Sequence, residues 1–206
     1  MVISILNLAF LIAPIIVISL VLAKFGTIEG KGKRGERVAE RAIKKAGYQV
    51  ISDLYVSASR GWTQIDHVVI AGGALVCIEV KNYAGSIYGQ KHEKSWTQVC
   101  GRQKNKFQNP IHQNHAHVCS LRELFPEVDV RGFVAFTPRS TFKRDRPDGV
   151  GTTNNLKEVL DRIAANVPTS PAAAQAWSML QSMAASERQQ DGRKAHREQL
   201  RQRNRM

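Results

Sequence analysis

The stretch from Ile65 to Lys81 (IDHVVIAGGALVCIEVK) constrains the fold of this chain more than any other. It consists of two apolar runs, residues 65–71 and 74–80, on either side of Gly72-Gly73. A glycine pair readily adopts the positive φ values that a tight hairpin turn requires. We therefore predict an antiparallel hairpin that is apolar on both faces, as are the covered strands of α/β proteins.

Three charged side chains, those of Asp66, Glu79 and Lys81, interrupt this apolar hairpin. With a two-residue turn, Asp66 is expected opposite Glu79, and Lys81 falls on the same face as Glu79. Directly opposed residues lie about 4.5–5.5 Å apart at Cβ. Unpaired charge buried there would cost several kcal/mol, which favours a chemical role. A salt-bridged pair or an exposed hairpin end is the structural alternative.

Two adjacent carboxylates also predict a cation beside them. Each raises the pKa of the other unless positive charge joins them, and Lys81 supplies a single charge. Carboxylate oxygens suit Mg²⁺ or Mn²⁺, whose remaining positions are filled by water and substrate phosphate. The hairpin therefore predicts a site for Mg²⁺ (or Mn²⁺).

The N-terminal segment has the composition of a membrane anchor. The first 23 residues carry no charged side chain, and a helix over residues 2–23 would be about 33 Å long, enough for a bilayer core of about 30 Å. A cleaved signal peptide is the alternative, but no positive n-region or small-x-small cleavage site is present. Cations follow the segment, so we predict a single-pass protein of a bacterial inner membrane, with its N-terminus outside and its body in the cytoplasm.

The formal net charge is +13, and all of it belongs to residues 24–206. Such an excess indicates a polyanionic partner, either nucleic acid or anionic lipid, whereas a solubility surface is the alternative. Two groups of cations are candidates for phosphate contacts with nucleic acid: Arg102, Lys104 and Lys106, and then Lys143, Arg144 and Arg146.

A second candidate metal site lies in the predicted helix over residues 109–124. His112, His115 and Cys119 share one face of that helix, near His117, and such residues can bind zinc. Because the spacing is irregular, polar residues on a helix surface are the favoured interpretation. The three cysteines of the chain show no C-x-x-C spacing and fit a reducing compartment.

Hydrophobic periodicity places the other elements around the hairpin and predicts an α/β fold, a mixed β-sheet core flanked by helices. Asn109 and Pro110 have the residue types of a helix N-cap and a first helical residue. Trp62 and Trp96 are expected to pack rather than stack on bases. The remaining expectations are helices over 35–46, 155–167 and 170–186, strands over 48–56, 86–88 and 130–136, a polar, exposed loop or edge over 91–96, a basic irregular loop over 139–153, and a basic, disordered or fraying tail from Glu187.

At this point the sequence resembles the nuclease-related domain (NERD) of the PD-(D/E)xK nuclease superfamily. The residues that carry the resemblance, within residues 32–137, are Gly35-Glu36, Ile65-Asp66-His67-Val68-Val69, Glu79-Val80-Lys81-Asn82, Asn109-Pro110 with Gln113, and Phe133-Val134-Ala135-Phe136. Ile65 stands where the superfamily name has proline. The resemblance implies a restriction-endonuclease-like core and Mg²⁺-dependent cleavage of phosphodiester bonds. The expected organisation is then an anchor (1–24), a linker (25–34), a nuclease-like domain (35–168), and a C-terminal helix with a basic tail (169–206).

The resemblance also implies roles for individual residues. Glu36, Asp66, Glu79 and Lys81 are the expected catalytic residues, and Asp66, Glu79 and the carbonyl group of Val80 the expected metal ligands. Lys81 would orient the attacking water or offset charge on the phosphorane, and Glu36 would reach the metal through water or position Lys81. The expected function is a membrane-anchored nuclease that acts on DNA rather than RNA. A catalytically weak module that binds nucleic acid at the membrane, and an interaction scaffold without nucleic acid, are the alternatives.

Overall fold

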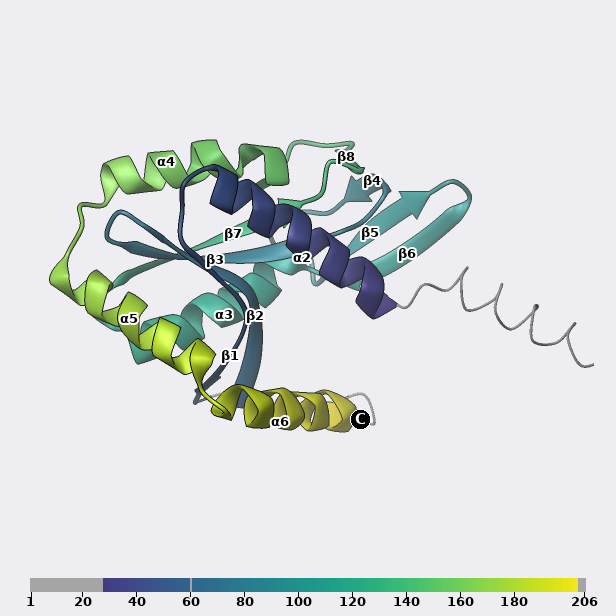
Figure 1. Ribbon diagram of the computed structural model, residues 1–206. Coiled ribbons are helices and arrows are strands. Elements are labelled where there is room, and N and C mark those ends of the chain that lie inside the picture. The colour runs from purple at the N-terminus through teal and green to yellow at the C-terminus, as the bar shows by residue number, and fades with distance from the viewer. Residues whose placement is uncertain (1–27, 60, 204–206) are drawn as a thin grey trace, which may run out of the picture.

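Two mixed β-sheets and five α-helices form the part of the chain that the computed structural model describes, residues 28–59 and 61–203 (Figure 1). The α/β class and the mixed sheet flanked by helices are therefore confirmed. The helices are α2 (Ile28–Lys45), α3 (Pro110–Leu124), α4 (Leu156–Asn166), α5 (Pro171–Ala185) and α6 (Arg188–Arg203). The strands are β1 (Val50–Ala58), β2 (Gly61–Ala71), β3 (Ala74–Lys81), β4 (Gly85–Tyr88), β5 (Ser95–Cys100), β6 (Gln103–Gln108), β7 (Asp129–Phe136), β8 (Ser140–Phe142) and β9 (Val150–Thr152).

The predicted membrane anchor, residues 1–24, lies outside the described residues. Within the described residues, no helix is both long enough and apolar enough to cross a bilayer.

The predicted hairpin is the centre of the main sheet, which has the order β1-β2-β3-β7-β9. Strands β2 and β3 pair in the expected register, with Ala71 opposite Ala74 and His67 opposite Ile78. The turn is at Gly72-Gly73, where a Cβ on Gly72 would lie 2.2 Å from the carbonyl oxygen of Val167. Glycine is therefore required by the positive φ of Gly72 and by the close approach of the chain that follows α4.

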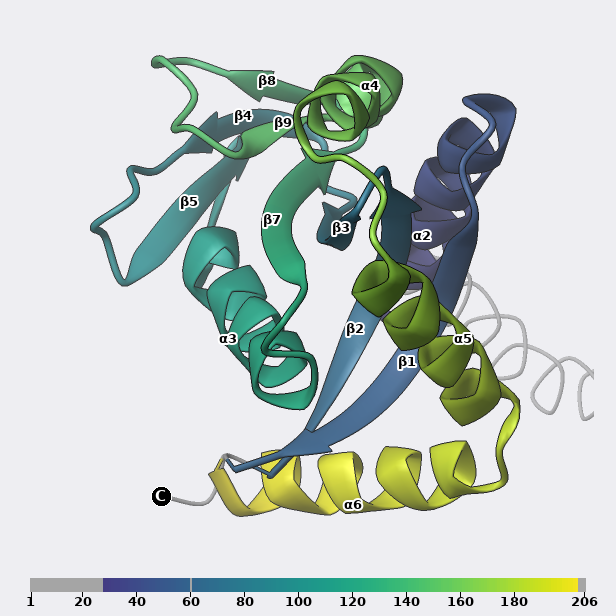
Figure 2. The same ribbon diagram turned by 90° about the vertical axis from the view of Figure 1, so that its left-hand side faces the viewer.

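Helices cover both faces of the main sheet. Figures 1 and 2 show α2 and α3 on opposite sides of it. Alternate β3 side chains belong to different core clusters, because Val76 and Ile78 pack with α2 and α4 whereas Leu75 and Cys77 pack with α3 and α5. Continuing this alternation, Glu79 and Lys81 point to the α3 side.

A second sheet, with the order β6-β5-β4-β8, packs against β7 and α3 through a cluster of aromatic and aliphatic residues. Trp96 of β5 is fully buried and stacks on Phe136 of β7, with the ring centroids 6.1 Å apart. Packing of Trp96 is thus confirmed. The expectation of an exposed loop or edge over 91–96 is wrong at Trp96, and the polar residues 103–108 form strand β6.

The linker and the C-terminal tail also differ from the expectations. Helix α2 begins at Ile28 and so includes most of the residues expected to form a linker over 25–34. The expected disordered or fraying tail is wrong, because residues 188–203 form α6, which lies across the far ends of β1 and β2 in both views (Figures 1 and 2). Polar contacts hold this helix: the Gln189 amide bonds to both backbone groups of Tyr55, and Arg193 pairs with Asp53 at 2.7 Å.

Of the expectations for the region 139–153 and for Trp62, the structure confirms the second and only part of the first. The region 139–153 is not wholly irregular, since β8 and β9 each add a short parallel edge strand to a sheet. Trp62 packs beneath α6, where a Cβ on Gly192 would come within 2.6 Å of its ring. Trp62 therefore contributes packing, as expected.

Candidate active site

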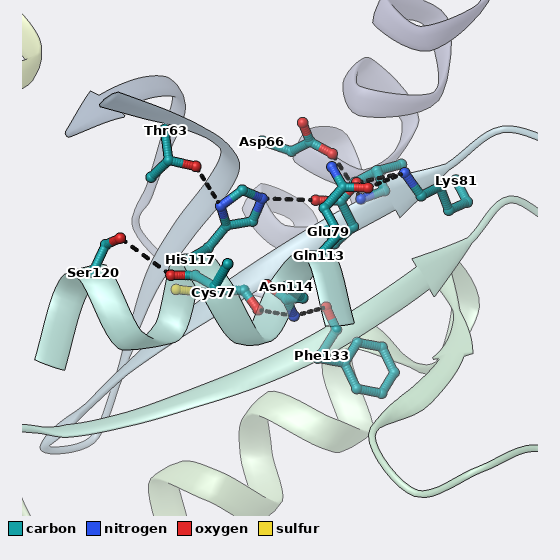
Figure 3. A network of polar contacts seen from close by, with 12 residues as sticks. Thr63, Asp66, Cys77, Glu79, Lys81, Gln113, Asn114, His117, Ser120 and Phe133 are labelled. Carbon is teal, nitrogen blue, oxygen red and sulfur yellow. Dashed lines mark hydrogen bonds and ion pairs between the residues drawn. The ribbon is translucent and has the colours of Figure 1, made fainter. Parts of the chain in front are cut away.

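Glu79 and Lys81 lie at the end of β3, an inner strand between β2 and β7. The Glu79 side chain is 2% exposed, and Lys81 Nζ donates to its Oε1 atom at 2.7 Å (Figure 3). Lys81 Nζ also donates to Oε1 of Gln113 on α3, at 2.9 Å. Burial works against the charge of Lys81, but the carboxylates of Glu79 and Asp66 raise its pKa above the ordinary value. Lys81 is thus held as a cation, with its direction set by two partners.

His117 of α3 approaches the second oxygen of Glu79. Its Nε2 lies 3.2 Å from Glu79 Oε2, and its Nδ1 lies 2.9 Å from Oγ1 of Thr63 on β2 (Figure 3). The Glu79–His117 distance suits an ion pair, but the direction does not suit a hydrogen bond, so both atoms are buried without a hydrogen-bond partner in the described chain. Burial raises the pKa of Glu79, but His117 and Lys81 outweigh it and hold the pKa below the ordinary value. Glu79 is therefore a buried carboxylate whose two oxygens face Lys81 and His117.

Asp66 joins this group from β2, one residue beyond the last paired position of the hairpin. Its Oδ2 accepts a hydrogen bond from the Val80 backbone N–H at 2.8 Å. Burial, with the charges of Glu79 and Glu36, raises the pKa of Asp66 well above the ordinary range, although Val80 N–H and Lys81 act in the opposite direction. The structure therefore brings Asp66, Glu79 and Lys81 together, as the hairpin register predicted.

Glu36 comes from α2, which Gly35 and His67 hold against the sheet. A Cβ on Gly35 would lie 2.6 Å from Cβ of Asn82, so only glycine lets the helix approach the end of β3 this closely. The buried His67 ring lies 3.1 Å from the Glu36 carbonyl oxygen through Nε2 and 2.9 Å from Ser52 Oγ through Nδ1. A carbonyl can only accept, so Nε2 carries the proton. Burial lowers the pKa of His67, which agrees with a neutral ring.

The Glu36 carboxylate is half-buried beside the other acids. Burial is the largest cause of its raised pKa. The negative charges of Asp53 and Glu79 raise the pKa further, whereas Lys33 lowers it. Within the described residues this carboxylate makes no hydrogen bond or ion pair, and so none with Lys81. Glu36 therefore contributes negative charge near the site without a direct contact to it.

Helix α3 supplies the side chains that complete the network. Its predicted N-cap is confirmed, since Asn109 Oδ1 accepts from Ile111 N at 2.9 Å. Asn114 Nδ2 donates to the carbonyl oxygens of Cys77 and Phe133, which ties α3 to β3 and β7. Gln113 and His117 are four residues apart, so both lie on the face that meets Lys81 and Glu79. His117 entered the sequence prediction only beside the candidate zinc ligands, although its spacing from Gln113 is the signal that could have assigned it to this site.

The residues considered for zinc do not converge. His112 Nε2 lies 2.8 Å from the Lys91 carbonyl oxygen, His115 lies 3.5 Å from Cys119, and His117 faces Glu79. The described chain contains no group of three or more His, Cys, Asp or Glu side chains arranged to hold a metal ion.

Asp66, Glu79 and the Val80 carbonyl group offer oxygen atoms only, which is the donor type of Mg²⁺ and Mn²⁺. Mg²⁺ commonly binds proteins through one or two carboxylates, with water and substrate phosphate as the other ligands. The Oε2 atom of Glu79, which makes no hydrogen bond, and the raised pKa of Asp66 fit such a cation.

The six cations predicted to contact phosphate lie elsewhere, and all are exposed. Lys104 and Lys106 lie on β6, and Arg102 lies in the turn before it. Lys143, Arg144 and Arg146 follow β8, and the Arg146 guanidinium lies over the Phe142 ring. Of these six, Lys106 and Arg144 line a common groove.

The family of the chain follows from comparison with known proteins. The sequence model of the nuclease-related domain (NERD) family matches residues 31–137. A curated relative, an uncharacterized protein of Bacillus anthracis, is 39% identical over 119 residues, which are 55% of this chain and 56% of the relative. The chain thus matches about half the length of that relative. A crystal structure of a protein of unknown function shares 13% identity at a TM-score of 0.37, over 62% of this chain and 53% of that chain.

Proposed function

The chain belongs to the nuclease-related domain (NERD) family, and on that basis we propose that it hydrolyses phosphodiester bonds in nucleic acid with the help of a divalent cation. The observation that carries the proposal is the junction of Asp66, Glu79 and Lys81 around the end of β3, with Glu79 buried at its centre. Two carboxylates and one fixed ammonium group leave a net negative charge. That charge attracts a cation, and the cation can in turn bind a phosphate.

We propose that Asp66, Glu79 and the carbonyl group of Val80 would hold Mg²⁺ or Mn²⁺. When bound, such an ion polarises a non-bridging phosphate oxygen and lowers the pKa of a bound water. The ammonium group of Lys81, directed by Glu79 and Gln113, would orient the attacking water or balance the charge that develops on the phosphorane. Glu36 would act at longer range, through water.

Two variants test this assignment. Lys81→Met and Asp66→Asn keep the size of each side chain and remove its charge, and both should lose Mg²⁺-dependent cleavage while remaining folded by circular dichroism. Glu127→Gln, which neutralises an exposed carboxylate in the turn between α3 and β7, is the matched control and should cleave like the parent. Cleavage that persists undiminished in both Asp66→Asn and Lys81→Met would overturn the assignment.

We further propose DNA rather than RNA as the substrate. A panel of single-stranded, double-stranded, nicked and supercoiled DNA, with RNA beside it, tests this preference in Mg²⁺ and again with a chelator. Retention of DNA without any product in the panel would instead identify a binding module of nuclease-like fold. Failure to retain either nucleic acid at low salt would favour an interaction scaffold.

We also propose that residues 1–24 attach the protein to a membrane and that residues 25–206 lie in the cytoplasm. The uncharged apolar segment and the cations that follow it support this proposal. Alkaline extraction of membranes should leave the full chain in the pellet, whereas a chain starting at Phe25 should be released. Digestion of the body by a protease added to the outside of intact cells would contradict the cytoplasmic placement.

A further inference from the structure

The outer face of the second sheet combines cations with an exposed aromatic ring. Register places Lys106 of β6 opposite Thr97 of β5, and Thr97 opposite Tyr88 of β4, so these three side chains form one row on one face. Trp96 and Phe107 occupy the alternate positions and belong to the buried cluster. The row therefore faces solvent, and Tyr88 at its end is 37% exposed.

An open groove of about 450 Å³ runs along this row. Its cationic lining comes from three separate segments: Lys94 before β5, Lys106 on β6 and Arg144 after β8. None of these three side chains makes a hydrogen bond or ion pair with a described residue. Glu93 also lines the groove, but its Oε2 already accepts a hydrogen bond from the Gln90 N–H at 2.9 Å. Three cations without an ion-pair partner among the described residues thus share the groove with one carboxylate.

The base of the groove is rigid. A Cβ on Gly89 would lie 2.1 Å from the Trp96 ring, so the chain at Gly89 rests directly on a fully buried indole. The indole Nε1 donates to the Gln90 carbonyl oxygen at 3.0 Å, which fixes the segment that follows Tyr88. The tyrosine ring is therefore held on a supported backbone rather than on a free loop.

This combination matches one class of ligand. Cations along a groove bind a phosphodiester backbone of any kind, but an exposed aromatic ring gains a contact only when a base is free to stack on it. In a duplex the bases are already stacked on one another, whereas in a single strand they are accessible. We propose that this groove binds a single-stranded segment of nucleic acid, with a base on Tyr88 and phosphates on Lys94, Lys106 and Arg144. The inference rests on the proposed function, and it adds which form of the substrate is recognised.

Equilibrium binding of a fluorescent oligothymidylate to the full chain, with a chelator present to prevent cleavage, tests the proposal. Tyr88→Ala should weaken binding by roughly tenfold, because stacking on a base is lost, whereas Tyr88→Phe should bind like the parent. Lys106→Gln and Arg144→Gln should each lower the slope of log affinity against log salt by about 0.7, the value for one phosphate contact with a single strand. Lys45→Gln, a change of an exposed lysine on α2, is the matched control and should leave the slope unchanged.

Two outcomes would overturn the inference: binding by Tyr88→Ala that equals the parent, or a duplex of the same length bound as tightly as the single strand. Cleavage is measured separately on the same proteins in Mg²⁺. Absence of any cleavage with the groove effects intact would overturn the proposed function alone. Normal cleavage with no groove effect would overturn this inference alone.

Discussion

Replacing Asp66 with asparagine should raise the stability of the metal-free protein while it abolishes cleavage. Burial and the neighbouring carboxylates of Glu79 and Glu36 raise the pKa of Asp66 well above its ordinary range, so its charge opposes folding at neutral pH. Asparagine removes that charge and retains an oxygen that can accept the hydrogen bond from the Val80 N–H. The same change removes an oxygen ligand of the proposed cation.

The size of the effect follows from the repulsion between Asp66 and the nearby Glu79. Two unit charges about 5 Å apart repel by about 3 kcal/mol at an effective dielectric constant of about 20. Lys81 cancels part of this repulsion, so we expect Asp66→Asn to gain about 1–2 kcal/mol. For a chain of this length, that gain corresponds to a rise in Tm of about 2–8 °C.

The gain in stability from Asp66→Asn should become smaller as the pH is lowered. Above the raised pKa of folded Asp66 the penalty is fully present, because the group is charged in both the folded and the unfolded chain. As the pH falls from that pKa towards about 3.9, the ordinary value of the unfolded chain, folded Asp66 binds a proton and the penalty disappears. The difference in stability between the parent and Asp66→Asn should therefore be largest in mild alkali and should vanish in acid.

Thermal unfolding followed by circular dichroism, in the presence of a chelator and across pH 5–8, measures this difference. Glu127→Gln serves as the control, because its carboxylate is exposed and should give no such change. Added Mg²⁺ should raise the Tm of the parent but not that of Asp66→Asn, since only a folded protein that binds the ion is stabilised by it. A variant that melts below the parent at pH 8, or a difference that does not change with pH, would refute the reasoning.

Three further substitutions test other parts of the structure. His117→Ala leaves Glu79 buried with one partner fewer and should cost about 1–3 kcal/mol in chemical denaturation, so an unchanged midpoint would contradict its role. Trp96→Ala empties the core of the second sheet and should cost about 3–5 kcal/mol in the same assay, and a loss below 1 kcal/mol would contradict the packing described. Gly192→Val should clash with Trp62 and detach α6, which amide hydrogen exchange would detect as faster exchange in α6 with little change in β3; equal protection of α6 in parent and variant would argue against this packing.

The features that the sequence predicted correctly are those fixed by neighbouring residues. The Gly72-Gly73 turn sets the register of β2 and β3, which is paired as far as His67 opposite Ile78 and leaves Asp66 near Glu79. The Asn109-Pro110 pair sets the first turn of α3. Asn109 caps the helix with its side chain, and Pro110 lacks the backbone N–H that would have no partner within the helix at this position. In each case the determining contacts lie within a few residues of one another.

The features that the sequence did not reveal depend on contacts between distant segments. Strand β6 (QKNKFQ) has little of the branched and aromatic character of a strand, and its pairing with β5 supplies the order instead. Helix α6 has too few apolar residues for a hydrophobic stripe, and polar contacts from Gln189 and Arg193 to β1 hold it. His117 is a similar case, because its role depends on where α3 crosses β3.

Helix α3 is the element that relates the proposed catalytic residues to the groove of the second sheet. At its beginning, Asn109 Nδ2 donates to the carbonyl oxygens of Lys91 and Glu93, and so fixes the segment that leads to Lys94 in the groove. One turn later, Gln113 holds Lys81. A strand bound in the groove would therefore be held at a fixed position relative to Lys81, because one rigid helix carries both sets of contacts.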